Sequence, residues 1–167
     1  MLQTLQQRLV KTVPQILAFP AKFMPFAVQE KILSGVLNRV FAEALEDDEF
    51  EFLEQKWLQV SVQDLGLTWF ISCVDNKLVV ADSAPQSDVS FRGNLNELVL
   101  ITARKEDPDT LFFQRRLQIE GDTELGLEVK NMLDSFDLEE LPEVANKLLM
   151  FLADFIKQGL TKPLKSA

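Results

Sequence analysis

Residues 107–131 constrain the fold of this chain more than any other stretch, because they predict three elements in close succession. The segment reads DPDTLFFQRRLQIEGDTELGLEVKN. Pro108 suits the first turn of a helix, where its missing amide hydrogen is not needed. Residues 116–120 place apolar side chains on one face, which predicts a strand. An acidic turn follows, and Asp122 or Thr123 is placed to cap the next helix.

Four more strands are predicted upstream. Alternating apolar and polar residues predict the first two, although Phe70 and Val74 break the alternation in the second. The third is predicted as the returning strand of a hairpin, and the fourth has Val89 and Phe91 facing inward. The four strands span Trp57–Gln63, Leu67–Val74, Lys77–Ala81 and Asp88–Arg92. The Asp75-Asn76 pair suits the hairpin turn between the second and third of these strands, because both residue types tolerate left-handed backbone angles. Asn94 is placed to cap a helix, and Pro142 to open the last one. The order of elements predicts an α+β fold, with helices packed on one face of a five-stranded, largely antiparallel sheet.

The N-terminal residues read as a helical extension. Residues 1–17 place their leucine, valine and isoleucine side chains mainly on one helical face, which predicts an amphipathic helix. A second helix is predicted from about Phe26 to Leu45. Between the two lies the loop Phe19–Phe26, where two prolines break the helix. This loop carries phenylalanine and methionine where a connection is normally polar.

The sign of the charge changes at the end of this extension. Residues 1–40 hold five basic residues and one acid, a net charge of +4, whereas residues 41–54 hold seven acids and no base. We therefore predict that residues 1–45 are the extension, 46–160 the main domain and 161–167 a flexible tail. The acidic run is interpreted as a solvated helix end and linker, and the alternative is a docking patch for a basic partner.

The residue types that the chain lacks exclude several kinds of site. There is no histidine, no tyrosine and a single cysteine, Cys73. The usual general acid–base at neutral pH, an internal disulfide and a cysteine–histidine zinc site are therefore excluded. Glu120, Asp122 and Glu124 are close in sequence, but acids at a helix N-terminus are stabilising without a metal. We expect no catalytic residue, no metal ion and no cofactor.

The overall charge and hydropathy bear on partners and location. A net charge of −9 argues against nucleic-acid binding, which needs a basic surface. No stretch approaches ~18 consecutive apolar residues. The N-terminus lacks the compact apolar run and small-residue cleavage site of a signal peptide. The expected location is the cytoplasm, either free or peripherally attached to the inner face of the cytoplasmic membrane.

Several strings in the sequence point to a known family. They are FLEQKWLQVSV, DNKLVV, DVSFRG and LQIEGDTELGL. Over about residues 53–136 the chain resembles the sterol carrier protein type two (SCP2-like) domain, a lipid-binding family. The longer string ARKEDPDTLFFQRRLQIEGDTELGLEVKN and the helical extension are most similar to a bacterial group of accessory factors for ubiquinone biosynthesis.

The resemblance implies both a structure and a role. It implies an apolar cavity between sheet and helices that holds a lipid. It also implies support of ubiquinone synthesis in the absence of oxygen, alongside two iron–sulfur hydroxylases, UbiU and UbiV. Members of the group are regarded as accessory lipid-binding factors and not as enzymes, so no residue inherits a catalytic role.

A cavity for an isoprenoid tail should be lined by apolar and aromatic residues. The candidates are Trp69, Ile71, Phe91, Leu98, Leu111, Phe112, Leu125 and Val129. Each of them would equally well fill an ordinary core. Phe112-Phe113 followed by Arg115-Arg116 suggests a site for an aromatic or anionic head group. The alternative is one buried phenylalanine, one edge phenylalanine and two solvated arginines.

The aromatic loop has the composition of a membrane contact, because aromatic side chains enter the acyl boundary and lysines meet anionic headgroups. Its candidate residues are Phe19, Lys22, Phe23, Met24 and Phe26. The alternative is that the loop and both helices dock on the main domain or on a second copy, which would make the protein a homodimer.

Two functional hypotheses follow. In the first, the chain is an accessory factor that takes prenylated aromatic intermediates of ubiquinone, or other lipids, from the membrane and presents the ring to UbiU- and UbiV-type hydroxylases. In the second, it is a membrane-associated scaffold, or a phospholipid-binding protein, that binds no quinone precursor.

Overall fold

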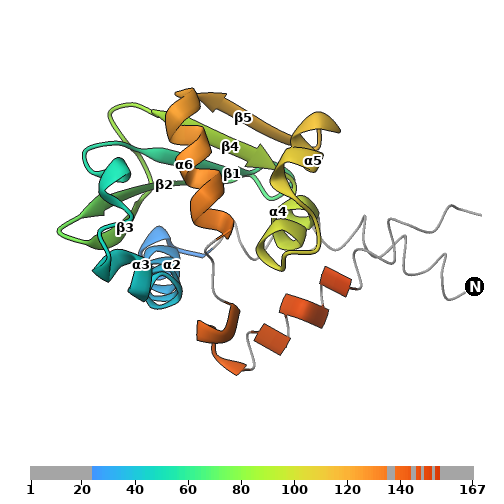
Figure 1. Ribbon diagram of the computed structural model, residues 1–167, viewed down its shortest axis with the longest axis horizontal. Helices are drawn as coiled ribbons and strands as arrows, with labels where there is room; N and C mark the ends of the chain where they lie inside the picture. The colour runs from blue at the N-terminus through green and yellow to red at the C-terminus, as the bar shows by residue number, and fades with distance from the viewer. Residues whose placement is uncertain (1–23, 135–137, 144–145, 148, 152, 155–167) are drawn as a thin grey trace, which may run out of the picture.

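A five-stranded sheet with helices beside it forms the described part of the computed structural model (Figure 1). The described residues are 24–134, 138–143, 146–147, 149–151 and 153–154. The helices are α2 (Phe26–Val40), α3 (Ala42–Glu46), α4 (Leu95–Thr102), α5 (Pro108–Phe113) and α6 (Thr123–Asp134), with short 3-10 turns η1 (Glu51–Leu53) and η2 (Leu138–Glu140). The strands are β1 (Leu58–Val62), β2 (Leu67–Val74), β3 (Lys77–Ala81), β4 (Val89–Gly93) and β5 (Leu117–Gly121).

The strands form one sheet in the order β3-β2-β1-β4-β5. Three neighbouring pairs are antiparallel, whereas β1 and β4 are parallel. Asp75 and Asn76 form the hairpin turn between β2 and β3, with φ angles of 50° and 55°. These findings confirm the predicted α+β fold, its largely antiparallel sheet and its hairpin turn.

The strand register brings the apolar side chains onto one face of the sheet. Val60 in β1 pairs with Trp69 in β2 and with Phe91 in β4, and Phe91 pairs in turn with Ile119 in β5. Because side chains alternate between faces, the apolar residues of each strand line up across the sheet. Figure 1 shows α6 crossing this face in front of β4 and β1. The buried core lies between this face and the helices.

Helix α2 packs beside β3, the edge strand at one side of the sheet. Asn38 Nδ2 donates a hydrogen bond to the Leu78 carbonyl oxygen at 2.8 Å, and Asn38 Oδ1 accepts one from the Leu78 N–H at 2.9 Å. Trp69 Nε1 donates to Gln29 Oε1 at 2.8 Å. Backbone groups that are occupied in this way cannot pair with the edge of another sheet.

The hydrogen bonds of Asn38 predict a measurable loss of stability on its removal. We expect Asn38→Ala to lower the free energy of unfolding by about 1–3 kcal/mol, because the partly buried N–H and C=O of Leu78 lose their partner. Urea denaturation followed by circular dichroism measures this. Asn131→Ala, on the exposed side of α6, is the matched control and should change stability by less than about 0.5 kcal/mol. Equal losses for the two variants would contradict the role of Asn38.

The predicted helix from Phe26 to Leu45 is interrupted at Phe41. This residue has a ψ of 20°, outside the helical range, and separates α2 from α3. Its ring is 2% exposed and contacts Phe50 edge-on at a centroid distance of 5.3 Å. At this break the Phe41 ring lies in the buried core, and its burial contributes to stability.

The first residue of α4 is capped by a residue far away in sequence. Asn94 precedes the helix as predicted, but its side chain makes no capping hydrogen bond. The Leu95 N–H instead donates to Asp64 Oδ1 at 2.9 Å. The prediction that the Asn94 side chain caps α4 is therefore wrong, because Asp64, in the turn after β1, accepts the hydrogen bond from the first N–H of the helix.

Some predictions concern segments outside the described residues. They are the amphipathic helix at 1–17, the residues Phe19, Lys22 and Phe23, and the tail at 161–167. The proposed domain boundary near residue 45 also stays a prediction.

Candidate functional site

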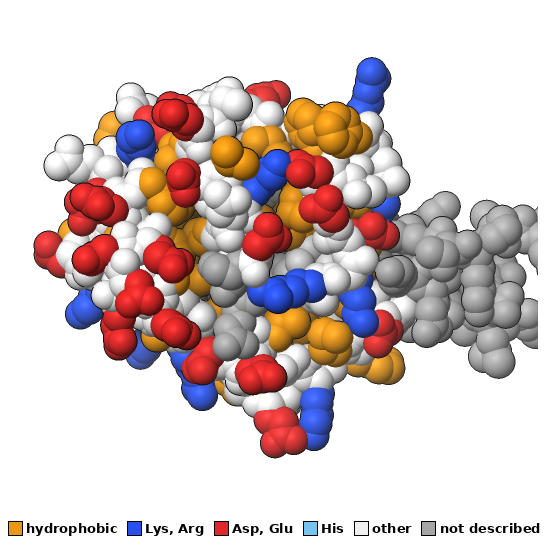
Figure 2. All heavy atoms as spheres, in the orientation of Figure 1, with side chains coloured by type: hydrophobic (Ala, Val, Ile, Leu, Met, Phe, Trp, Pro, Cys, Tyr) orange, Lys and Arg blue, Asp and Glu red, His pale blue; other side chains and the backbone are white. Residues whose placement is uncertain are grey.

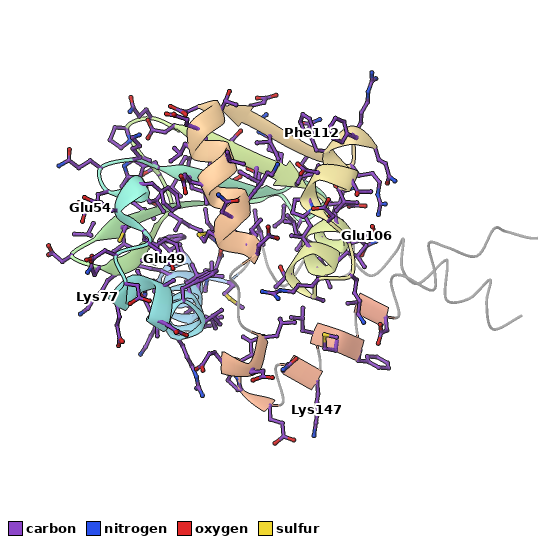
Figure 3. All side chains as sticks on the ribbon, viewed as in Figure 1. Glu49, Glu54, Lys77, Glu106, Phe112 and Lys147 are labelled. Atoms are coloured by element: carbon purple, nitrogen blue, oxygen red, sulfur yellow. The ribbon has the colours of Figure 1, made fainter. Side chains whose placement is uncertain are left out.

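An open apolar groove lies along β5, the edge strand at the other side of the sheet, between α5 and α6. It consists of two adjoining hollows with volumes of about 460 Å³ and about 390 Å³. Phe112, Ile119 and Glu120 line both hollows, so the two meet at these residues. Figure 3 labels Phe112 on α5 beside β5. This feature is termed the β5 groove.

The walls of the β5 groove are apolar where the sheet meets the helices. Ile119 lies on the face of the sheet that α6 covers, and an added Cβ at Gly126 of α6 would lie 3.6 Å from it. The side chains of Phe112 and Leu127 are 42% and 54% exposed. Large apolar residues that gather at an opening, instead of being scattered singly, are typical of a binding surface for an apolar ligand.

The shape of the groove depends on the turn between β5 and α6. Gly121 has a φ of 111°, and a Cβ on it would lie only 2.4 Å from the Asp88 carbonyl oxygen. That oxygen accepts a hydrogen bond from the Asp122 N–H at 2.9 Å. Asp122 Oδ1 accepts one from the Leu125 N–H at 3.0 Å, which confirms Asp122 as the cap of α6. The Gly-Asp pair therefore fastens the start of α6 to the start of β4.

Residues of the Phe-Phe-x-Arg-Arg segment line the smaller hollow. Their environments differ from the alternative of one buried phenylalanine, one edge phenylalanine and two solvated arginines. The rings of Phe112 and Phe113 meet edge-on at 5.7 Å, and Phe113 is 80% exposed, so neither ring is buried. Arg116 Nε lies 3.3 Å from Glu97 Oε1, so this guanidinium is held in an ion pair. Arg115 is exposed and lines the smaller hollow. Of the two arginines, Arg115 is therefore the one available to a ligand.

Carboxylates surround the larger hollow. Asp109, Glu120, Asp122 and Glu124 line it, together with Lys130, which forms an ion pair with Asp109. Because like charges repel, this acidic rim favours a neutral ligand over an anionic one. Within the described part of the chain, no group of three acidic or cysteine side chains is placed to hold a metal ion.

The eight predicted cavity residues lie in different environments. Phe112 lines the β5 groove. Four are buried in the core: Phe91, Leu111, Leu125 and Val129. Three are partly buried: Trp69, Ile71 and Leu98. The role of these residues as lipid contacts stays a prediction.

Two groove residues, Ile119 and Leu127, are absent from the set predicted from the sequence. Ile119 belongs to the predicted strand at residues 116–120, but the strand pattern does not show that the sheet ends at this strand and leaves Ile119 beside an opening. Leu127 lies off the core stripe of α6, which contains Leu125 and Val129. An apolar residue on the outer face of an amphipathic helix is the signal that would have identified it.

Cys73 and the acidic run have ordinary environments. Burial raises the pKa of the Cys73 thiol, and the neighbouring Glu54 carboxylate raises that pKa further. The thiol therefore stays protonated at neutral pH, which makes it a poor nucleophile. The seven acids between residues 43 and 54 are all exposed, and Figure 2 shows acidic side chains gathered over α3 and the residues after it. They fit a solvated surface.

Two of the predicted membrane contacts lie within the described residues. Met24 is 42% exposed and Phe26, the first residue of α2, is partly buried. No helix among the described residues combines the length and the apolar character needed to cross a bilayer.

Comparisons with known proteins agree with this geometry. Residues 36–134 match the model of the SCP-2 sterol transfer family. The chain is 51% identical over 160 residues to the ubiquinone biosynthesis accessory factor UbiT of Escherichia coli (strain K12), an alignment that covers 96% of this chain and 91% of that protein. The solved structure titled "UbiJ-SCP2 Ubiquinone synthesis protein" has the same fold, with a TM-score of 0.56 at 16% identity over 66% of this chain and 97% of that one. The chain therefore belongs to the SCP-2 sterol transfer family.

Proposed function

We propose that this protein is a lipid-binding accessory factor of oxygen-independent ubiquinone biosynthesis, which holds prenylated aromatic intermediates and performs no chemistry on them. The observation that carries this proposal is the β5 groove, an open apolar surface in a chain that is 51% identical to a ubiquinone biosynthesis accessory factor. An isoprenoid tail is stabilised there by about 25 cal/mol for each Å² of apolar surface removed from water.

The two hollows suit different parts of one ligand. The larger hollow, with Ile119 and Leu127, accepts the apolar tail. The smaller hollow offers the aromatic rings of Phe112 and Phe113 for an edge-on or offset contact with the ligand ring. Arg115 donates hydrogen bonds to a ring oxygen there. Because Phe113 is 80% exposed, a ring beside it stays accessible to a partner protein, which we propose to be a hydroxylase of the UbiU or UbiV type.

Prenylated intermediates reside in the membrane, so the protein must reach a lipid surface to collect them. We propose that residues 19–26 make this contact through Phe19, Lys22, Phe23, Met24 and Phe26. Replacing Phe19, Phe23 and Phe26 with serine should reduce co-sedimentation with liposomes, and unchanged co-sedimentation would rule this contact out.

Mass spectrometry of an organic extract tests the proposed cargo directly. We expect protein purified from cells grown without oxygen to carry about one prenylated phenol or quinone per chain. Bound phospholipid in its place would support the second hypothesis, a phospholipid-binding protein without quinone precursors. An empty extract, with no lipid taken up on later addition, would replace the proposal with a scaffold role.

A further inference from the structure

The two edges of the sheet differ in how their backbone groups are used. At β3, Asn38 occupies both the N–H and the carbonyl oxygen of Leu78. At β5, the last strand in the sheet order, no strand in the described part of the chain pairs with the outer side. Figure 1 shows β5 along the margin of the sheet, with α5 near its start and α6 near its end. A strand edge of this kind can pair with a strand of another chain.

The register decides which backbone groups of β5 face outward. Just past β5, the Asp122 N–H donates to the Asp88 carbonyl oxygen at 2.9 Å, which marks these two residues as a hydrogen-bonded pair of the ladder. In an antiparallel ladder such pairs alternate with pairs that share no hydrogen bond. Glu120 and Gln118 therefore bond to β4, whereas Ile119 between them directs its N–H and its carbonyl oxygen outward.

The charges along β5 and its flanks run from basic to acidic. Arg115 and Arg116 precede the strand, Glu120 lies near its end, and Asp122 and Glu124 follow it. When two identical strands pair antiparallel, the start of one lies beside the end of the other, so each basic end meets an acidic end. A parallel pair would instead place like charges opposite each other, which is destabilising.

We infer that two copies of the chain pair antiparallel through β5, with Ile119 of one copy opposite Ile119 of the other, and that five strands from each copy form one continuous sheet. Gln118 then lies opposite Glu120 of the second copy, and its amide donates a hydrogen bond to that carboxylate. Both side chains are exposed and point to the face of the sheet away from Ile119. The inference goes beyond the proposed function, because the two strands pair whether or not a lipid is bound.

The second copy adds a wall to the β5 groove. The register places the residues before Leu117 of one copy beside the residues after Gly121 of the other. Phe113, 80% exposed at the end of α5, therefore comes next to the larger hollow of the second copy. Leu117 is itself buried, so the backbone pairing is short and centred on Ile119. A contact of this size fits a weak, reversible dimer.

Disulfide trapping tests the register of this pairing. Gln118 and Glu120 of the second copy form a pair without backbone hydrogen bonds, whose Cα atoms lie about 4.5 Å apart, within the range that a disulfide spans. Mixing Gln118→Cys chains with tagged Glu120→Cys chains under mild oxidation should give a covalent dimer with one chain of each kind. Either variant alone should cross-link at least about tenfold more slowly, because its two cysteines are diagonal neighbours about 7–8 Å apart.

Cys73 is buried and does not compete in this experiment. Non-reducing electrophoresis separates the mixed dimer from the others through the tag. If the mixture gives no covalent dimer, the inference is overturned. It is also overturned if each variant cross-links alone as fast as the mixture does, since that result shows random collision.

A charge exchange tests the same contact without a covalent bond. Gln118→Glu places two carboxylates opposite each other at two points of the pair, so the dissociation constant of the dimer should rise about tenfold. Adding Glu120→Gln exchanges the two residues and should restore the original dissociation constant. Val74→Glu, at the end of β2, adds the same charge elsewhere and should change nothing. Sedimentation equilibrium of the full chain measures all four proteins, and a dissociation constant unchanged by Gln118→Glu overturns the inference.

Other occupants of the edge and the proposed function are distinguished by separate readouts. A chain that stays monomeric at all concentrations while its Ile119 N–H is protected from hydrogen exchange has the edge covered by another of its own segments, which overturns the pairing. Lipid extracted from each variant is quantified by mass spectrometry. A dimer without lipid supports the pairing and contradicts the proposed function, whereas a monomer that carries lipid overturns the pairing and leaves the proposed function standing.

Discussion

The Gly121→Ala variant should lose about 3 kcal/mol or more of unfolding free energy, because alanine is strained at a φ of 111° and its Cβ would overlap the backbone of Asp88. The nearest backbone atom is 2.4 Å from the ideal Cβ position, and a backbone atom cannot move aside as a side chain does. Relief of the overlap requires β5 to separate from β4 at the point where Asp122 binds Asp88. Chemical denaturation and thermal melting both measure the loss.

Gly126→Ala is the matched control for this prediction. Gly126 lies in α6, where an added Cβ would make ordinary contacts with Ile119 at 3.6 Å and with Val89 at 3.8 Å. The same change of residue should therefore keep stability or raise it by up to about 1 kcal/mol, the difference in helix propensity between the two residues. Similar losses of unfolding free energy at both positions would show that the φ of Gly121 and its closeness to the Asp88 backbone do not require glycine there.

Two glutamates introduced into the β5 groove should abolish lipid loading. We expect the double variant Phe112→Glu, Leu127→Glu to carry at least about tenfold less prenylated lipid, because burying a carboxylate against an apolar tail costs several kcal/mol. The existing acidic rim adds repulsion to this cost. Both side chains are largely exposed, at 42% and 54%, so the melting temperature should change little. Quantitative mass spectrometry of the extract measures the loading.

Val74→Glu controls for charge and for the loss of an exposed apolar residue. Val74 is 52% exposed at the end of β2, away from the groove. This variant should load lipid normally. Normal loading of the double variant would show that the lipid binds elsewhere in the protein. Loss of loading in both the double variant and Val74→Glu would show that added surface charge lowers loading wherever it is placed.

The sheet could be predicted closely because its strands bury one face. The apolar and polar residues of Leu58–Val62 alternate in the sequence and form β1, and the Asp75-Asn76 turn follows from residue type alone. The parallel pairing of β1 with β4 could not be predicted from local patterns. It joins strands far apart in sequence, and no local pattern states which strands become neighbours.

Features that depend on distant residues could not be predicted. The Phe41 ring, at the break between α2 and α3, contacts the distant Phe50, and the cap of α4 comes from Asp64. In the candidate site, Phe112 could be predicted from the sequence. The sequence pattern does not distinguish an apolar residue that fills the core from one that lines an opening. Periodicity reports which face of an element is apolar, whereas an opening such as the one beside Leu127 depends on where the neighbouring element ends.

The order of strands has a consequence for how the protein engages two partners at once. Helix α2 lies beside β3 and the β5 groove lies at the other margin of the sheet, four strand spacings or about 19 Å away. Under the proposed function, residues 24–26, at the start of α2, contact the bilayer, and the β5 groove lies at the far margin of the sheet from that helix. In that arrangement we propose that the bilayer and the hydroxylase bind without competing, so that cargo changes hands while the carrier stays anchored.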